Sequence, residues 1–183
     1  ASFQYTYQSP LNYANPINWW TTVSEASNIL AGGYAIFGQK WNEKQKTMFK
    51  NPFAQFLKVE TNFTKLWSLA KKSSVAARIN AGVVWAYGNS SVAPYSEQFF
   101  VGGANSIRAF NAREIGPGKY RSTSRMRSFV EQTGEIKLQA NLEYRPHILG
   151  NLYGAVFLDA GNVWTMKADE GRPESEFKFN SFF

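Results

Sequence analysis

The stretch EIKLQANLEYR, residues 135–145, alternates between apolar and polar side chains. Its apolar positions are Ile136, Leu138, Ala140, Leu142 and Tyr144. The polar positions between them are Lys137, Gln139, Asn141, Glu143 and Arg145. Because successive side chains of a β-strand point to opposite faces of the sheet, this period of two predicts a strand with one apolar face and one polar face.

Similar strands are expected along the rest of the chain. Residues 57–63 and 75–87 show related alternation, and residues 2–7, 18–30 and 153–164 are further strand candidates. We therefore expect an all-β chain of about six strands.

The lengths of the connections separate two kinds of β protein that share this alternation. Short and long intervals follow one another: residues 8–17, 31–52, 68–74, 88–134, 146–152 and 165–176. Outer-membrane β-barrels have short turns on one side of the membrane and longer loops on the other. A soluble β-sandwich also has one-sided strands, but it gives no reason for such an order. The pattern favours an antiparallel transmembrane β-barrel.

Composition limits the function further. The chain has 183 residues, no cysteine and a net charge of +7. Disulfides and thiolate metal sites are thereby excluded, and the dispersed positive charge does not indicate nucleic-acid binding. Aromatic residues make up 16% and cluster near the expected strand ends, as in the interfacial girdle of a membrane barrel. In a soluble protein the same residues would form the core.

The first and last residues already have strand character, so we expect a piece of a larger domain.

The longest interval, residues 88–134, contains the candidate site. Within it, Gly102-Gly103 precedes Ile107-Arg108-Ala109-Phe110. No Gly-Lys-Ser/Thr sequence follows the glycine pair, so a phosphate-binding loop is not expected. Later in the chain, Asp159 is an isolated carboxylate within an apolar strand, where it requires a counter-charge or a water-filled lumen.

Counting along the strands places candidate partners on the polar face. Glu143 lies on this face, and Asp159 shares its own face with Phe157 and Gly161. An arginine fits such carboxylates because its planar guanidinium binds them through two parallel hydrogen bonds. Two simpler alternatives remain open: Arg108 as a solvated loop residue, and residues 159–162 as an ordinary turn that ends a strand.

Three motifs, in order along the chain, resemble the barrel of the BamA/TamA outer-membrane assembly superfamily, also called bacterial surface antigens. They are the arginine loop Ile107-Arg108-Ala109-Phe110, the strand end Leu142-Glu143-Tyr144, and Phe157-Leu158-Asp159-Ala160-Gly161. The resemblance covers about residues 18–183. Ala109 departs from the family pattern, which has glycine there, and a different local backbone is expected if that position needs a positive φ.

The resemblance implies a sixteen-stranded barrel preceded by periplasmic POTRA domains, of which residues 1–183 would be a partial barrel. It implies that the loop at about residues 88–134 folds into the lumen and that Arg108 pairs with Asp159, close to Glu143. The implied location is the bacterial outer membrane. Implied partners are unfolded outer-membrane proteins, the lipid and lipopolysaccharide bilayer, and periplasmic or lipoprotein accessory subunits, with no nucleic acid and no cofactor or metal.

The resemblance implies insertion and folding of other outer-membrane proteins without covalent chemistry. Enzymatic activity is not expected, because the chain has one histidine, no cysteine and no Gly-x-Ser-x-Gly sequence. Two alternatives from other functional classes remain: a two-partner polypeptide secretion pore, which shares the arginine-loop motif, and a passive porin or structural barrel.

Overall fold

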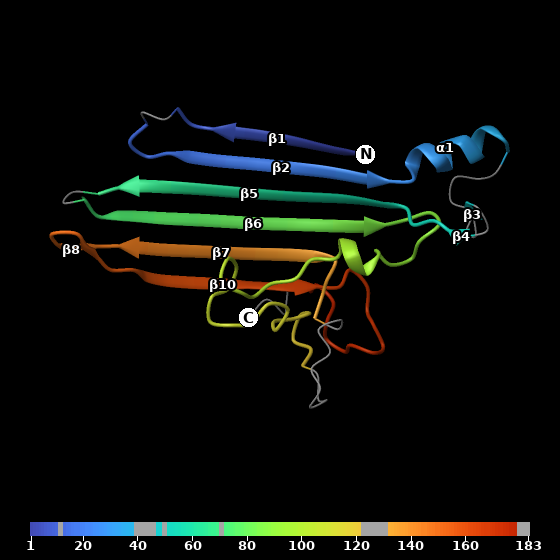
Figure 1. Ribbon diagram of the computed structural model, residues 1–183. Helices are drawn as coiled ribbons and strands as arrows, with labels where there is room; N and C mark the ends of the chain where they lie inside the picture. Colours follow the sequence, from blue (N-terminus) through green and yellow to red (C-terminus); the bar gives the residue numbers. More distant parts are fainter. Residues whose placement is uncertain (11–12, 39–46, 49–50, 70–71, 122–131, 179–183) are drawn as a thin grey trace.

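The protein contains one large antiparallel sheet with strand order β1-β2-β5-β6-β7-β10 (Figure 1). The computed structural model describes residues 1–10, 13–38, 47–48, 51–69, 72–121 and 132–178. The six strands of this sheet are β1 (Ser2–Gln8), β2 (Ile17–Ala26), β5 (Phe56–Ser68), β6 (Ser74–Ala86), β7 (Ile136–Arg145) and β10 (Val156–Trp164). The prediction of an all-β chain built on an antiparallel sheet is confirmed.

Smaller elements lie in the connections. They are α1 (Asn28–Ile36), β3 (Thr47–Met48), β4 (Asn51–Pro52), η2 (Tyr95–Glu97), β8 (His147–Leu149) and β9 (Leu152–Tyr153). The β1–β2, β5–β6 and β7–β10 connections lie at one end of the sheet, and the longer β2–β5 and β6–β7 connections lie at the other (Figure 1). None of the helices in the described ranges has the length and apolar character of a membrane-spanning helix.

The predicted strand at residues 18–30 was wrong at its C-terminal end. Strand β2 stops at Ala26, which lies opposite Phe56, the first residue of β5. A longer β2 would have no partner on that side for its backbone groups. The chain instead turns at Ser27, where φ is 63°, and enters α1, in which backbone hydrogen bonds are internal.

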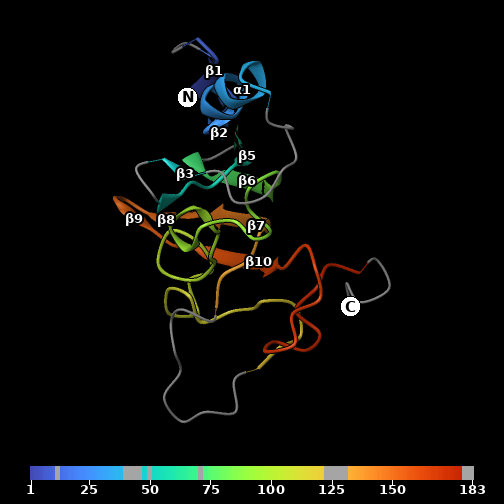
Figure 2. The same ribbon diagram turned by 90° about the vertical axis from the view of Figure 1, so that its right-hand side faces the viewer.

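The two faces of the sheet differ in what covers them. On the apolar face, Leu142 of β7 lies opposite Leu158 of β10, and both side chains are exposed. The other face carries the polar residues of β5, β6 and β7, and the described part of the β6–β7 loop packs against it at the β7 and β10 side of the sheet (Figures 1 and 2). The sheet therefore presents an uncovered apolar face and a loop-covered polar face.

The hydrophobic core lies between the sheet and this loop. Near the long-loop end of the sheet the polar face becomes apolar, with Val84 and Val163 fully buried. Loop residues complete the cluster; its members are Phe56, Val84, Ala86, Ala93, Phe99, Val101, Ile107 and Val163. The described part of the β6–β7 loop is therefore packed against the sheet by apolar contacts as well as by polar ones.

Phe99 is a loop residue whose ring lies against β6. Its side chain is 5% exposed, and a Cβ added at Gly82 of β6 would lie 2.5 Å from the ring. Lys58 and Lys137 lie 4.9 and 5.8 Å from the ring centroid. The absence of a side chain at Gly82 provides the space in which Phe99 is seated.

Candidate functional site

The Arg108 side chain joins the loop to two strands of the sheet. Its Nε donates to Asp159 Oδ2 at 2.8 Å and its Nη2 donates to Asp159 Oδ1 at 2.9 Å, which makes a two-pronged contact with β10. Its Nη1 donates to Glu143 Oε2 on β7. The Arg108 backbone N–H donates to Asp159 Oδ2 at 3.1 Å, so both side chain and main chain are held. A single loop residue thus binds two neighbouring strands.

The strand register explains how one guanidinium reaches both carboxylates. Glu143 lies opposite Phe157, and Asp159 lies opposite Asn141. The two acidic residues are therefore diagonal neighbours on the polar face, close enough to be reached by the separate nitrogens of one arginine.

Phe157 and Gly161 flank Asp159 on the same face and shape the site. The Arg108 Cζ lies 3.8 Å from the centroid of the Phe157 ring, a cation–π distance. A Cβ added at Gly161 would lie 2.8 Å from the Leu138 backbone oxygen. Phe157 therefore supports the guanidinium, and the close approach of β7 leaves no room for a side chain at Gly161.

Each carboxylate of the site has a cationic partner, and water has limited access to the pair. The side chains of Asp159, Glu143 and Arg108 are 4%, 17% and 27% exposed. A second arginine, Arg145, donates from Nε to Glu143 Oε1 at 2.6 Å, which gives two cations for two carboxylates. Hydrogen bonds to Asp159 and then Glu143 raise the pKa of Arg108, so the guanidinium stays charged. Arg108 is not simply a solvated loop residue.

The glycine pair gives the loop the backbone path that leads to Arg108. Gly102 and Gly103 have φ of +104° and +95°, values that favour glycine. The Gly103 N–H donates to the Phe110 carbonyl at 2.8 Å, which closes the loop around the arginine. Ile107 is buried in the core, whereas Phe110 is half exposed.

Alanine fits at position 109 without backbone strain. The described non-glycine residues with positive φ are Ser27, Lys72, Arg113 and Glu174, and Ala109 is not among them.

We expect Gly102→Ala to destabilise the protein more than Gly103→Ala. At either position an alanine would take a rarely populated φ, at a cost of about 1–3 kcal/mol. A Cβ at Gly102 would in addition lie 2.1 Å from the Asn111 backbone oxygen, whereas at Gly103 the nearest atom is the Ala112 Cβ at 3.7 Å. Urea unfolding of the full-length protein would measure the two losses, and equal losses would contradict the steric argument.

The other residues considered from the sequence have simpler roles. Residues 159–162 do not form a turn, because β10 continues to Trp164. His147 contacts the Gly150 carbonyl and the Tyr153 ring within the β8–β9 hairpin. Across the described ranges there is no group of three or more histidine, cysteine, aspartate or glutamate residues able to hold a metal ion.

Sequence reasoning missed three residues of the site: Arg145, which pairs with Glu143, and also Asn141 and Arg78. Asn141 donates to Asp159 Oδ1 at 2.8 Å, and Arg78 donates to Asn141 Oδ1. Both lie on the polar face predicted for their strands, but face alone does not specify a partner. The missing information was the register, which sets both of them in one row with Asp159.

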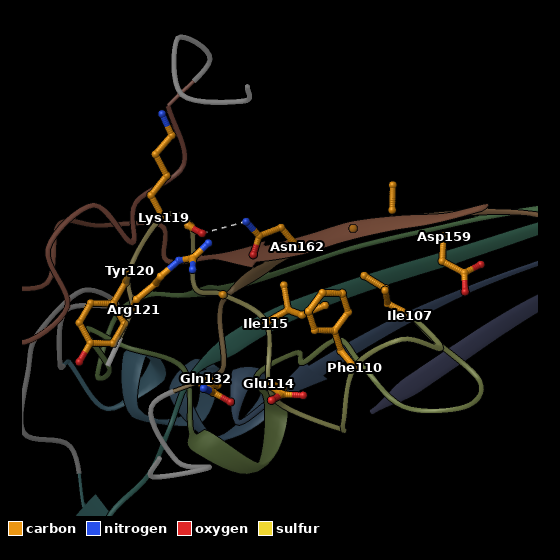
Figure 3. A pocket seen from close by; sticks show the side chains of 14 residues that line it. Ile107, Phe110, Glu114, Ile115, Lys119, Tyr120, Arg121, Gln132, Asp159 and Asn162 are labelled. Atoms are coloured by element: carbon orange, nitrogen blue, oxygen red, sulfur yellow. Dashed lines mark hydrogen bonds between the residues drawn. The ribbon is translucent and has the colours of Figure 1, made fainter. Parts of the chain in front are cut away.

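A cavity of about 780 Å³ lies between the loop and β10, beside the arginine site (Figure 3). Ile107, Phe110, Asp159 and Asn162 are among its lining residues, and Asn162 Nδ2 donates to the Gly118 carbonyl at 2.9 Å across it. The loop is thus held to β10 at a second place, nearer the end of the strand.

Comparison with known proteins gives one family. The family model described as the Omp85 superfamily domain matches residues 1–180. No curated protein sequence matches the chain. The family match covers nearly the whole chain, including the arginine loop and both of its carboxylate partners.

Proposed function

The chain belongs to the Omp85 superfamily, and we propose that it forms part of the wall of an outer-membrane β-barrel that inserts and folds other outer-membrane proteins. The observation that carries this proposal is the binding of Arg108 to both Asp159 and Glu143. These contacts fix a long loop against the polar face of the sheet, which is the lumen face of the proposed barrel.

Insertion of a β-protein into a bilayer requires partners for its backbone groups. Each backbone N–H or C=O that enters lipid without a hydrogen bond costs several kcal/mol. A barrel that offers a strand edge to the incoming protein lowers this cost, because the edge supplies hydrogen bonds to the new strand. No covalent step and no cofactor are needed for this chemistry.

The strands of this chain contribute a part of the proposed barrel wall that is bound to the β6–β7 loop at several places. The loop contacts β6 through Phe99 and Gly82, β7 through Glu143, and β10 through Asp159. Three neighbouring strands are thereby tied to one inner segment. We propose that this bracing keeps the wall fixed while an edge elsewhere in the barrel exchanges partners.

The proposed surroundings follow from the two faces of the sheet. The exposed apolar face, which includes Ile79, Leu142 and Leu158, contacts lipid and lipopolysaccharide in the bacterial outer membrane. Unfolded outer-membrane proteins are the proposed clients. Periplasmic or lipoprotein accessory subunits are the further proposed partners.

Depletion of the full-length protein is the direct test. We expect the abundance of several unrelated β-barrel proteins in the outer membrane to fall, and a plasmid copy of the wild-type gene to restore it. Quantitative proteomics of isolated outer membranes is the measurement. Unchanged abundance of these proteins after depletion would contradict the assembly function.

A polypeptide secretion pore is the second candidate function. The observation that favours it is a cavity of about 590 Å³ between the loop and the sheet, whose lining includes the charged side chains of Lys58, Glu60, Arg78 and Lys137. Such a lining suits the passage of an extended hydrophilic chain. Depletion would then abolish the export of one secreted protein and leave membrane protein levels intact, whereas a passive porin would alter only permeability to small solutes.

A further inference from the structure

Three residues form a row across the polar face, directly beside the loop. Arg78 of β6 lies opposite Asn141 of β7, and Asn141 lies opposite Asp159 of β10. The register therefore places one cation, one amide and one carboxylate abreast on three adjacent strands. Asp159 binds Arg108, but the other two residues have no part in the arginine pair itself.

Both the nitrogen and the oxygen of the Asn141 side-chain amide are hydrogen-bonded to neighbouring residues. Its Nδ2 donates to Asp159 Oδ1 at 2.8 Å and to the Ser106 carbonyl at 2.7 Å. Its Oδ1 accepts from Arg78 Nε at 3.0 Å and from Arg78 Nη2 at 2.9 Å. Gln139 Nε2 also donates to this oxygen, at 2.8 Å.

These partners leave only one orientation for the amide. A guanidinium can only donate, so the atom that faces Arg78 must be the oxygen. A carboxylate and a carbonyl can only accept, so the atom that faces Asp159 and Ser106 must be the nitrogen. Neither a leucine nor an ionised aspartate at position 141 could make both sets of contacts.

Arg78 reaches the same part of the loop. Its Nη2 donates to the Asn105 carbonyl at 2.6 Å. Arg78 and Asn141 thus bind the carbonyls of two successive loop residues, which precede Arg108 by three and two positions. Because the contacts are made to the main chain, they do not depend on the side chains at positions 105 and 106.

We propose that Asn141 and Arg78 are positioning residues for the arginine site. They hold the loop backbone at residues 105 and 106 and, through Asn141, fix the carboxylate of Asp159 in the orientation that receives Arg108. The loop is then bound to the sheet at two places, through Arg108 and through the carbonyls of residues 105 and 106. The Asp159 carboxylate takes part in both, because it binds Arg108 and Asn141. This inference rests on the proposed bracing role of the loop, but its test does not depend on which proteins the barrel assembles.

Hydrogen exchange of the full-length protein in detergent micelles, followed by mass spectrometry, tests the proposal. Amides in residues 102–110 are expected to exchange at least about tenfold faster in Asn141→Leu and in Arg78→Met than in the wild type. Peptides from β2 and β5 are expected to exchange as before. The double variant is expected to exchange faster than either single variant but less than the product of the two single effects, because each residue binds one loop carbonyl and the two residues also bind each other.

A further variant separates hydrogen bonding from the filling of space. Asn141→Asp has almost the same shape as the native residue but cannot donate when ionised, and it places a second carboxylate beside Asp159. We expect it to expose the loop as strongly as Asn141→Leu does.

A matched control lies on the same face. Asn62 of β5 donates from Nδ2 to Thr64 Oγ1 at 3.2 Å. Asn62→Leu is expected to leave exchange in residues 102–110 unchanged. The proposal is overturned if Asn141→Asp exchanges like the wild type, or if exchange rises equally throughout the sheet.

Discussion

Asp159→Ala is expected to lower the free energy of unfolding of the full-length protein by up to about 3–5 kcal/mol, the cost of removing one partner of a fully buried ion pair. The Asp159 side chain is 4% exposed and accepts four hydrogen bonds, three from Arg108 and one from Asn141. Its removal leaves those donors beside an apolar methyl group. Urea unfolding monitored by tryptophan fluorescence would measure the loss.

A double-mutant cycle shows whether this loss comes from the pair. Arg108→Ala is also expected to destabilise the protein, because Asp159 and Glu143 then lose their shared cation. The double variant should cost less than the sum of the single variants, with a coupling free energy of about 1–3 kcal/mol. Strictly additive losses would argue against pairing in the folded protein.

Asp169→Ala provides the matched control for Asp159→Ala. Asp169 pairs with Arg172, Nε to Oδ2 at 2.7 Å, but its side chain is 37% exposed. Exposed ion pairs contribute about 0–1 kcal/mol. A loss at Asp169 as large as that at Asp159 would show that removal of any aspartate has this effect, and that burial is not the cause.

The arrangement of the site was predictable where it depended on the period of the strands. Alternation by two determines which side chains share a face, and that was sufficient to put Glu143 and Asp159 on the polar side. The pairing of strands was not available from alternation, because a shift of two residues keeps the faces and changes every neighbour. The row formed by Arg78, Asn141 and Asp159 is a property of the register.

The packing of the loop was less predictable than the composition of the faces. Val84 and Ala86 lie on a face whose other positions include Arg78 and Asn80, so the sequence of β6 predicted a mixed surface. In the structure both are buried beneath the loop. An apolar residue on a polar face indicates that another segment of the chain packs on it. Which segment does so depends on contacts between residues far apart in the sequence, and these cannot be read from the alternation of one strand.

Phe99→Ala is expected to cost about 3–5 kcal/mol in free energy of unfolding, the range for truncation of a buried aromatic side chain. The ring lies over Gly82 at 5% exposure, and its loss leaves a cavity between loop and sheet.

Gly82→Val is expected to destabilise the protein by about 1–3 kcal/mol for the opposite reason, because a Cβ would lie 2.5 Å from the ring and force it out. In the double variant, the valine occupies the space that the ring has left, so its loss should be smaller than the sum of the two single losses. Gly33→Ala is the control, since a Cβ there meets no atom within 4 Å. Additive losses for Gly82→Val and Phe99→Ala would show that the ring does not lie on Gly82, and would remove the loop's contact with β6 from the proposed bracing.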